Sequence, residues 1–317
     1  MAAIATITFN PALDKSVSIP ELISERKLKC SVPVYEPGGG GINVARAIKK
    51  LGGEAVALYL AGGSAGQMIG ELLSGDGVPS IAIDRKANTR ENLIVTDLAT
   101  RKQYLFDMPG SAVLENEWQK CLAALGKLDN LQYIVVSGSM PGGLPPDIFQ
   151  RLSHIATQKK AKLIADTSGE ALRQAVEAGV YLVKPNLKEL GLLTNREDLT
   201  AGDAAKIARR LIAEYPVEVV VVSLGALGAL LVTDQFSITV SPPDVKIAST
   251  VGAGDSLVGG IVYYLSLGKD IVDAVKFGVA CGSAATLNFG TELCTKVDAE
   301  RIYQAVQTSG QALCNQS

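Results

Sequence analysis

Apolar and polar positions alternate in blocks that predict short strands between amphipathic helices. The predicted strands with continuous apolar character are 133–137, 162–166, 181–184, 217–223 and 229–233, and the helices between them are 115–125, 147–158, 170–178, 187–193 and 202–213. A run such as Val219 to Val222 is typical of a sheet that is covered on both faces. Strands that alternate with helices predict parallel β-α-β units, and therefore an α/β core.

The first hundred residues follow a different pattern. Segments 17–19 and 29–35, after a β-rich run at 4–9, alternate polar and apolar residues as half-exposed strands do. Segments 92–97 and 103–106 alternate in the same way and are predicted to form a hairpin. We therefore expect a single domain over residues 1–317 with a small β-sheet lid, formed approximately by 12–36 and 88–108. The remaining predicted elements are helices at 42–51 and near 66–73, a buried strand at 55–60, and mostly helix after residue 255.

Composition and charge exclude several function classes. Thirty Lys and Arg against 32 Asp and Glu give a net charge of −2 with no basic block, so nucleic-acid binding has no electrostatic support. No stretch approaches the ~18 apolar residues of a membrane span, and the N-terminus lacks a signal-peptide pattern. Five scattered cysteines and one histidine, His154 in helix-like sequence, argue against a disulfide framework, a zinc site or a histidine triad. We expect a soluble, cytoplasmic protein that contacts neither nucleic acid nor membrane.

The segment Thr250-Val251-Gly252-Ala253-Gly254-Asp255-Ser256 is the first candidate for chemistry. Two glycines let the backbone approach a ligand closely, and the apolar run that follows reads as the start of a helix. A helix N-terminus binds anions through its free N–H groups and the positive end of its dipole. Asp255 inside such a site is either a helix cap or a catalytic group, and the segment alone does not separate the two.

A second glycine-rich stretch, Gly38 to Gly41, precedes a predicted helix that begins Ile42-Asn43. Bare backbone there could support a ligand, and Asn43 could offer it a donor and an acceptor. The alternative is a flexible turn into a helix. The stretch is neither a Walker A loop nor a GxGxxG fingerprint.

Two further motifs follow predicted strands. Asn186 and Glu189 share a face of a starting helix, so their oxygens suit Mg²⁺, although the same spacing also describes a capping box. The segment 223–228 lies where ligands bind in open α/β sheets, or it is a plain hairpin turn.

Charged and polar residues in the predicted small sheet form a dispersed fourth candidate. Asp14, Lys27, Arg90 and Asn92 are ordinary surface residues in the simplest interpretation. In a chain with balanced charge, however, a phosphorylated substrate would require a few placed cations such as these.

These motifs, in this order, resemble the ribokinase-like (PfkB) family of carbohydrate kinases over essentially the whole chain. The resemblance rests on the glycine-rich stretch before Ile42-Asn43-Val44-Ala45-Arg46, on Asn186-x-x-Glu189 and on Thr250 to Asp255. Within the family the chain most resembles the minor 6-phosphofructokinase branch, because Gly40 stands where many 1-phosphofructokinases and tagatose kinases carry lysine. The segments 26–30 and 282–288 resemble the same branch. The implied fold is a Rossmann-type three-layer α/β sandwich with a β-sheet lid that is often a dimer interface.

The resemblance also implies the ligands and the residues that hold them. The sugar phosphate would contact Asp14, Lys27, Gly39, Asn43, Arg90, Asn92, Ser139 and Asp255. ATP would lie along Lys184, Asn186, Ser223, Leu224, Gly225, Ala226, Leu227, Gly228 and Ser283, with Mg²⁺ near Glu189. A potassium ion would be held by oxygens around Ser249, Val251, Ala285, Asn288, Gly290 and Glu292.

The activity implied is transfer of the ATP γ-phosphoryl group to the C1 hydroxyl of fructose 6-phosphate, a step of glycolysis. Asp255, ionised at its usual pKa of ~3.9, would accept the hydroxyl proton, and the N–H groups of Gly252, Ala253 and Gly254 would stabilise the transferring group. A homodimer and inhibition by excess ATP are further expectations. Alternatives that stay open are a 1-phosphofructokinase or tagatose-6-phosphate kinase, a non-catalytic sugar- or nucleotide-binding protein, and a dinucleotide-dependent dehydrogenase.

Overall fold

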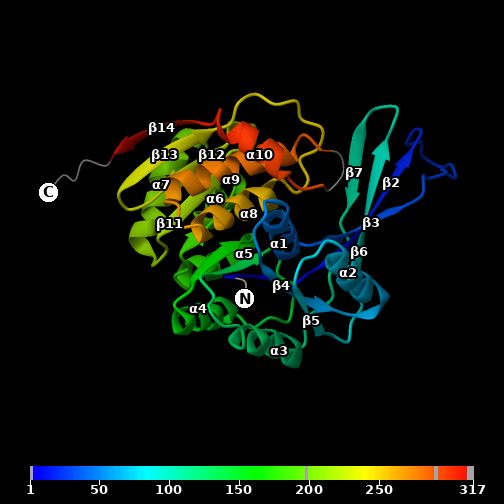
Figure 1. Ribbon diagram of the computed structural model, residues 1–317, viewed down its shortest axis with the longest axis horizontal. Coiled ribbons are helices and arrows are strands. Elements are labelled where there is room, and N and C mark those ends of the chain that lie inside the picture. The colour runs from blue at the N-terminus through cyan, green and yellow to red at the C-terminus, as the bar shows by residue number, and fades with distance from the viewer. Residues whose placement is uncertain (1–2, 197–198, 289–291, 313–317) are drawn as a thin grey trace.

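A ten-stranded sheet forms the centre of the protein in the computed structural model, which describes residues 3–196, 199–288 and 292–312 (Figure 1). Its strand order is β14-β13-β12-β11-β10-β9-β8-β1-β4-β5. The bounds are β1 Ile4–Thr8, β4 Val56–Ala61, β5 Ser80–Asp84, β8 Tyr133–Ser137, β9 Lys162–Asp166, β10 Leu182–Val183, β11 Val219–Ser223, β12 Ala229–Val232, β13 Phe236–Ser241 and β14 Gln307–Ala312. The pairs from β5 to β11 are parallel, as predicted.

Helices cover both faces of this sheet, which confirms the predicted three-layer α/β class. The first face carries α1 Gly40–Lys50, α2 Gly63–Gly75, α8 Ala253–Ser266 and α9 Ile271–Ala285, with α10 Lys296–Tyr303 packed on α9; the second carries α3 Glu115–Gly126, α4 Ile148–Lys159, α5 Gly169–Glu177, α6 Leu187–Leu193 and α7 Ala201–Glu214. Val220 and Val222 belong to the core under α3–α7, whereas Val219 and Val221 belong to the core under α1, α2, α8 and α9. The continuous valine run therefore reflects burial on two faces, because successive side chains of a strand point to opposite sides.

A separate four-stranded sheet, called the small sheet below, stands beside the core in Figure 1. It contains β2 Ala12–Ile19, β3 Val34–Gly38, β6 Arg90–Asp97 and β7 Lys102–Phe106, in the order β3-β2-β6-β7. The β6–β7 pair is antiparallel, as the predicted hairpin requires, and β2 pairs in parallel with β6. A small apolar cluster around Val17, Ile19 and Val95 stabilises one of its faces.

Several predicted elements were wrong. The segment 29–33 has no strand and β3 begins only at Val34, since Pro33 offers no N–H and its neighbours are exposed. The strand β12 was predicted, and it runs antiparallel to β11 as the hairpin alternative for 223–228 requires, because a connection of five residues is too short for a parallel crossover. Strands β5, β13 and β14 were not predicted. β14 ends a region that was expected to be helical, and its polar sequence QTSGQA pairs with β13 at the edge of the sheet.

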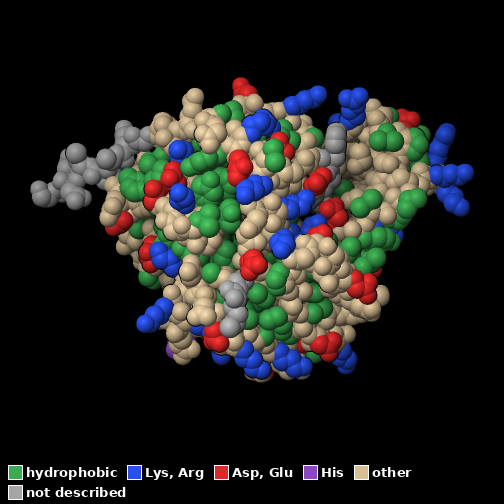
Figure 2. Space-filling view, viewed as in Figure 1, with side chains coloured by type: hydrophobic (Ala, Val, Ile, Leu, Met, Phe, Trp, Pro, Cys, Tyr) green, Lys and Arg blue, Asp and Glu red, His purple; other side chains and the backbone are tan. Residues whose placement is uncertain are grey.

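The surface agrees with the charge pattern of the sequence. Figure 2 shows basic and acidic side chains interspersed over the visible face of the core, while basic side chains gather at the outer end of the small sheet. His154 is exposed on α4, as predicted. Within the described ranges, no helix has the length and apolar character needed to cross a bilayer.

Candidate active site

Polar side chains gather where parallel strands of the large sheet end. Parallel strands present their carboxyl ends at one edge, which is where ligands bind in open α/β sheets. The side chains that follow or end these strands are Asn10 after β1, Ser137 and Ser139 at β8, Asp166 at β9, Lys184 after β10 and Ser223 at β11. The small sheet begins at the same edge, because β2 follows β1 after three residues.

Asp255 is the third residue of α8 and does not cap that helix. The N-cap is Gly252, whose φ of 76° favours glycine, and no side-chain hydrogen bond caps the helix. Asp255 Oδ2 instead accepts a hydrogen bond of 2.9 Å from Asn43 Nδ2, a residue 212 positions earlier in the chain. The structure therefore removes the capping interpretation and joins the two glycine-rich motifs at one carboxylate.

The environment of Asp255 changes its protonation. Burial raises the pKa of Asp255 to about 7, and the Asp166 carboxylate adds to the rise. The hydrogen bond from Asn43 and the charge of Lys184 act in the opposite direction. The expectation of a fully ionised aspartate is therefore wrong for the ligand-free protein. A carboxylate that is about half ionised near neutral pH is well matched to general-base catalysis.

The four-glycine stretch is required by packing as well as by any ligand. A Cβ on Gly40 would lie 2.4 Å from Ser137 Oγ, and one on Gly41 would lie 2.5 Å from the Ile7 carbonyl oxygen. Ile42 N then donates to Thr8 Oγ1 at 2.8 Å. The start of α1 thus lies directly against the ends of β1 and β8, which brings Asn43 to the edge where ligands bind. Neither alternative from the sequence, a ligand support or a flexible turn, included this reason.

A network of hydrogen bonds joins the small sheet to the core beside Asn43. Asn92 Nδ2 donates to Asp14 Oδ1 at 2.8 Å, and Arg90 Nη2 donates to the Asn10 carbonyl oxygen at 3.3 Å. Asn10 Nδ2 in turn donates to Ser139 Oγ at 2.9 Å. Burial raises the pKa of Asp14. These polar side chains form one continuous wall, which we call the sugar-side wall: Asn10, Asp14, Arg90, Asn92 and Ser139.

Two residues differ from what the sequence predicted for this wall: Lys27, which was predicted to belong to it, and Asn10, which was not. Lys27 is exposed in the loop between β2 and β3, and no hydrogen bond or ion pair joins it to another residue in the part of the chain that the structure describes. The sequence did not predict a site role for the Asn10 side chain, because the motif Asn10-Pro11 is typical of a turn. Only its bond to Ser139, 129 residues away, shows that its side chain belongs to the wall.

Lys184 and Asp166 form a buried ion pair on the other side of Asp255. Lys184 Nζ lies 3.0 Å from Asp166 Oδ1, and both side chains are about nine-tenths buried. Burial lowers the pKa of Lys184, but the charges of Asp166, Glu189 and Asp255 raise it further than burial lowers it. Asp166 was not among the sequence candidates. Its position at the end of a predicted parallel strand was the available signal.

Asn186 and Glu189 form the capping box that the sequence left as an alternative. Glu189 N donates to Asn186 Oδ1 and Asn186 N donates to Glu189 Oε2, each at 2.8 Å. The box does not remove Glu189 from the site, since its charge acts on Lys184.

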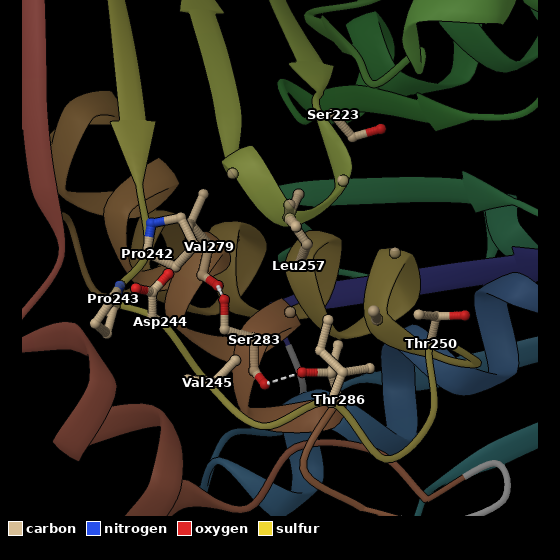
Figure 3. Close-up of a pocket in the computed structure, with 17 residues that line it drawn as sticks. Ser223, Pro242, Pro243, Asp244, Val245, Thr250, Leu257, Val279, Ser283 and Thr286 are labelled. Atoms are coloured by element: carbon tan, nitrogen blue, oxygen red, sulfur yellow. Dashed lines mark hydrogen bonds between the residues drawn. The ribbon is translucent and has the colours of Figure 1, made fainter. Parts of the chain in front are cut away.

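An elongated cavity of about 320 Å³ begins at the helix start that carries Asp255 (Figure 3). Thr250, Ala253 and Gly254 line one end, and the turn between β11 and β12 lines another side with Ser223, Gly225, Ala226 and Gly228. Figure 3 shows Pro242 and Pro243 beside Val279 of α9 at the left of the view, with Leu257 and Thr250 farther to the right. Leu224 and Leu227 do not line the cavity, and Leu227 is exposed. The turn is both a hairpin connection and part of the cavity, so the two alternatives for it were compatible.

The apolar walls of this cavity were not predicted. They come from segments 242–247 and from Leu257 and Val279. Apolar residues at such spacing resemble any core positions in a sequence, so nothing local marked them as ligand-facing.

The residues expected around potassium lie on two adjacent loops. Ala248 N and Ser249 N donate to the Thr286 carbonyl oxygen at 2.7 and 3.3 Å, and Asn288 N donates to the Ala285 carbonyl oxygen at 3.2 Å. Val251 N donates to Ser249 Oγ at 3.3 Å, which places Val251 on the same loop. Glu292 forms an ion pair with Lys50 at 3.4 Å. Gly290 lies outside the described residues.

The comparison with known proteins gives one consistent result. The profile of the pfkB family carbohydrate kinases matches residues 5–298. ATP-dependent 6-phosphofructokinase isozyme 2 of Escherichia coli is 44% identical over 304 residues, which cover 96% of this chain and 98% of that protein. The enzyme of the same name from Mycobacterium tuberculosis is 41% identical over 302 residues, or 95% of this chain and 89% of that protein.

Crystal structures of Escherichia coli phosphofructokinase-2 have the same fold. The structure in complex with potassium superimposes with a TM-score of 0.92 at 44% identity, covering 96% of this chain and 99% of that one. A second structure, described as the tetrameric inhibited form, has a TM-score of 0.90 at 43% identity with the same coverage.

Proposed function

The chain belongs to the pfkB family of carbohydrate kinases, and from this premise we propose that it is an ATP-dependent 6-phosphofructokinase. The proposed reaction transfers the γ-phosphoryl group of ATP to the C1 hydroxyl of fructose 6-phosphate and gives fructose 1,6-bisphosphate and ADP. One observation supports the assignment to this site: Asp255 lies at a helix start whose Ala253 and Gly254 line the cavity, it is bound by Asn43, and the charge of Asp14 in the sugar-side wall acts on it. A single carboxylate can therefore reach an acceptor hydroxyl on one side and a phosphoryl group on the other.

The proposed steps follow from the residues around Asp255. The carboxylate accepts the proton of the C1 hydroxyl as the oxygen attacks the γ-phosphorus, and Asn43 holds the carboxylate in place. The N–H groups of Gly252, Ala253 and Gly254, together with the helix dipole at the start of α8, would stabilise charge on the transferring group. In the ligand-free protein the Ala253 N–H donates a long hydrogen bond of 3.4 Å to the Thr250 carbonyl oxygen, which the phosphoryl group would replace. Lys184, kept protonated by Asp166, adds a positive charge beside the same loop.

The two substrates are assigned to opposite sides of this loop. ATP is assigned to the elongated cavity, with the Ser223–Gly228 turn and Ser283 along it and Lys184 and Asn186 at its phosphate end. The sugar is assigned to the wall on the small sheet, where Asp14, Asn92, Ser139 and the backbone of Gly39 meet its hydroxyls. Arg90 is the cation assigned to the 6-phosphate. Lys27 is assigned as a second cation for the same phosphate, on the condition that its exposed loop moves to a phosphate site.

The acidic groups near Lys184 fit Mg²⁺ that arrives with ATP. Asp166 contacts Lys184 at 3.0 Å, and the charges of Glu189 and Asp255 also act on Lys184. Among residues placed by the structure, no cluster of three or more His, Cys, Asp or Glu could hold a metal ion unaided. Mg²⁺ commonly keeps several waters and uses phosphate oxygens, so few protein ligands suffice. When bound, the ion would neutralise phosphate charge, with Asp166 and Glu189 as its protein-side ligands.

Potassium is assigned to the loops at 248–251 and 285–288, with Glu292 nearby. Their carbonyl and hydroxyl oxygens are the uncharged ligands that such a cation takes, and both loops adjoin the helix start of α8. The ion would stabilise the conformation of that start rather than enter the reaction.

We assign a homodimer that forms through the small sheet. This sheet and its loop expose Val32, Val34, Leu105 and Phe106, each more than 40% exposed. Apolar side chains concentrated in one exposed element favour a protein interface. Light scattering of the purified protein tests this assignment, and a monomer at micromolar concentration would contradict it. Inhibition by excess ATP is a separate proposal, and a hyperbolic ATP saturation curve at low fructose 6-phosphate would contradict it.

The direct test is phosphorylation of a panel of sugar phosphates with ATP, Mg²⁺ and K⁺, with the product position assigned by NMR. We expect fructose 6-phosphate to have the highest kcat/KM and to be phosphorylated at C1. Preference for fructose 1-phosphate or tagatose 6-phosphate would replace the proposed acceptor, and absence of ADP release with every sugar would indicate a binding protein. Both proposed substrates are intracellular metabolites, so we expect the enzyme to act in the cytoplasm.

A further inference from the structure

Arg90, the cation of the sugar-side wall, is already paired with a carboxylate in the ligand-free protein. Arg90 Nη1 donates to Asp107 Oδ1 and to the Met108 carbonyl oxygen, the latter at 2.9 Å. The Arg90 side chain is only 11% exposed, whereas that of Asp107 is 65% exposed. A mostly buried guanidinium therefore meets a carboxylate that solvent can reach, and a substrate phosphate could replace this carboxylate as the partner of the guanidinium.

Arg90 still has a donor to offer. Its Nη2 group carries two hydrogens and makes one bond, at 3.3 Å, to the Asn10 carbonyl oxygen. Its Nε has no hydrogen-bond partner among the residues that the structure describes, but it is buried and is not counted as a donor for a ligand. Nη1 and Nη2 form the outer edge of the guanidinium and Asp107 binds Nη1, so a phosphate group that binds Nη2 at this edge would lie beside the Asp107 carboxylate.

Asp107 differs from the other two aspartates near the sugar-side wall, because it faces the proposed phosphate ligand instead of a sugar hydroxyl. Asp14 and Asp255 are acidic as well, but both are assigned to sugar hydroxyls, and each has an asparagine donor. Asp107 has no such assignment and faces the group that would bind the substrate's phosphate. A carboxylate beside a phosphate dianion is repulsive, and it also neutralises part of the charge that attracts the phosphate.

We propose that Asp107 is a specificity-determining residue that competes with the substrate's phosphate for Arg90. In the empty site Asp107 holds the guanidinium, and a phosphorylated sugar must share or displace this pair in order to bind. Asp107 thus weakens the binding of phosphorylated sugars and keeps their KM high, without acting on the chemical step. This inference rests on the proposed function, because it assumes that the acceptor carries a phosphate at Arg90.

The test substitutes Asp107→Asn, which keeps the shape of the side chain and removes its charge. An exposed ion pair of this kind is worth up to about 1 kcal/mol, and the repulsion from a dianion adds to it, so the KM for fructose 6-phosphate should fall by about three- to tenfold. The KM for ATP should shift less than twofold. Salt screens exposed charges, so raising the ionic strength should reduce the difference between the wild type and the variant.

Glu91→Gln provides the matched control. Glu91 is exposed on the same strand as Arg90, its side chain points to the opposite face, and the substitution makes the same change in net charge. Its KM for fructose 6-phosphate should stay within twofold of the wild type. Unphosphorylated fructose provides the second control, since its binding should not respond to Asp107→Asn.

Each outcome has a definite meaning when direct binding of fructose 6-phosphate is measured by calorimetry beside the kinetics. A raised KM in Asp107→Asn would overturn the proposal and make Asp107 a residue that positions Arg90. An unchanged KM, or an equal effect in Glu91→Gln, would also overturn it. If the wild type binds fructose 6-phosphate but does not phosphorylate it, the proposed function fails while the binding comparison still tests Asp107. If the wild type does not bind it, both proposals fail.

Discussion

The raised pKa of Asp255 gives a prediction that separates this site from an ordinary aspartate. With a pKa of about 7, the carboxylate is about 9% ionised at pH 6 and about 91% ionised at pH 8. If Asp255 is the general base, kcat/KM for fructose 6-phosphate should rise about tenfold over that interval, because this parameter reports the free enzyme. An aspartate at its usual pKa would give no change there.

The variant Asn43→Ala tests whether Asp255 causes this rise of kcat/KM with pH, which we call the limb. The Asn43 side chain donates to Asp255 Oδ2 and lowers the pKa of that carboxyl, so its removal should raise the pKa further. A hydrogen bond to a charged group contributes about 1.5–3 kcal/mol, which corresponds to about one to two pH units. The limb should therefore move to about pH 8–9, together with a loss of sugar affinity.

Asn92→Ala is the matched control for this shift. Asn92 also donates to a carboxylate of the site, but that carboxylate is Asp14. Its removal should affect fructose 6-phosphate binding and should not move the limb to higher pH, because a less ionised Asp14 would lower the pKa of Asp255. The second ionisation of the sugar phosphate, near pH 6, contributes equally to all three enzymes and cancels in the comparison. A profile that is flat from pH 6 to 8 would refute the raised pKa of Asp255, and a limb that does not move in Asn43→Ala would refute the assignment of that limb to Asp255.

Four further predictions concern Asp255, Arg90 and Gly41. Asp255→Asn should lower kcat by about 10²- to 10⁴-fold, and activity within tenfold of the wild type would refute the role of the carboxylate. The same variant should melt at a higher temperature than the wild type at pH 8, because a raised pKa means that the charged form of Asp255 destabilises the folded state. This gain in melting temperature should shrink as the pH falls from 7 towards 4. Calorimetry at several pH values measures it. Arg90→Ala should raise the KM for fructose 6-phosphate by about 10- to 100-fold, the value of a charge-assisted hydrogen bond, and an unchanged KM would remove Arg90 from the phosphate site. Gly41→Ala should lower the free energy of unfolding by about 1–3 kcal/mol, because its Cβ would lie 2.5 Å from the Ile7 carbonyl oxygen. The control Gly75→Ala places its Cβ in open space and should not destabilise the protein. Urea unfolding measures both variants.

The strands of the core were predictable because a strand that is buried on both faces has a continuous run of apolar residues in the sequence. The segments 133–137 and 162–166 match β8 and β9 residue for residue, since an apolar run of five residues between polar turns has few other uses. The polar strand β14 had no such signal, because it pairs only along one edge and buries little. The direction of the predicted strand β12 was left open by the sequence, because an apolar strand has the same residue pattern whichever way it runs beside its neighbour.

The candidate site was partly predictable for a related reason. Gly252, Gly254 and Asp255 are neighbours in the chain, so their spacing carries chemical meaning by itself. Asp166 and Asp107 were missed, since each is a single carboxylate whose importance depends on a cation that another strand supplies. The capping box at Asn186 and Glu189 was visible in the sequence as an alternative, and the structure contains it in full.

The sequence by itself determined the class of the fold, the order of its motifs and the kind of chemistry, because these depend on short-range patterns of hydrophobicity and on residues that are adjacent in the chain. The tertiary structure alone decided the environment of Asp255, the proposed catalytic base. Asn43 and Asp255 are 212 residues apart, and the carboxylates and the lysine that set the pKa of Asp255 come from separate strands. Desolvation and charge act through space, so only the packed chain defines whether Asp255 caps a helix or serves as a base.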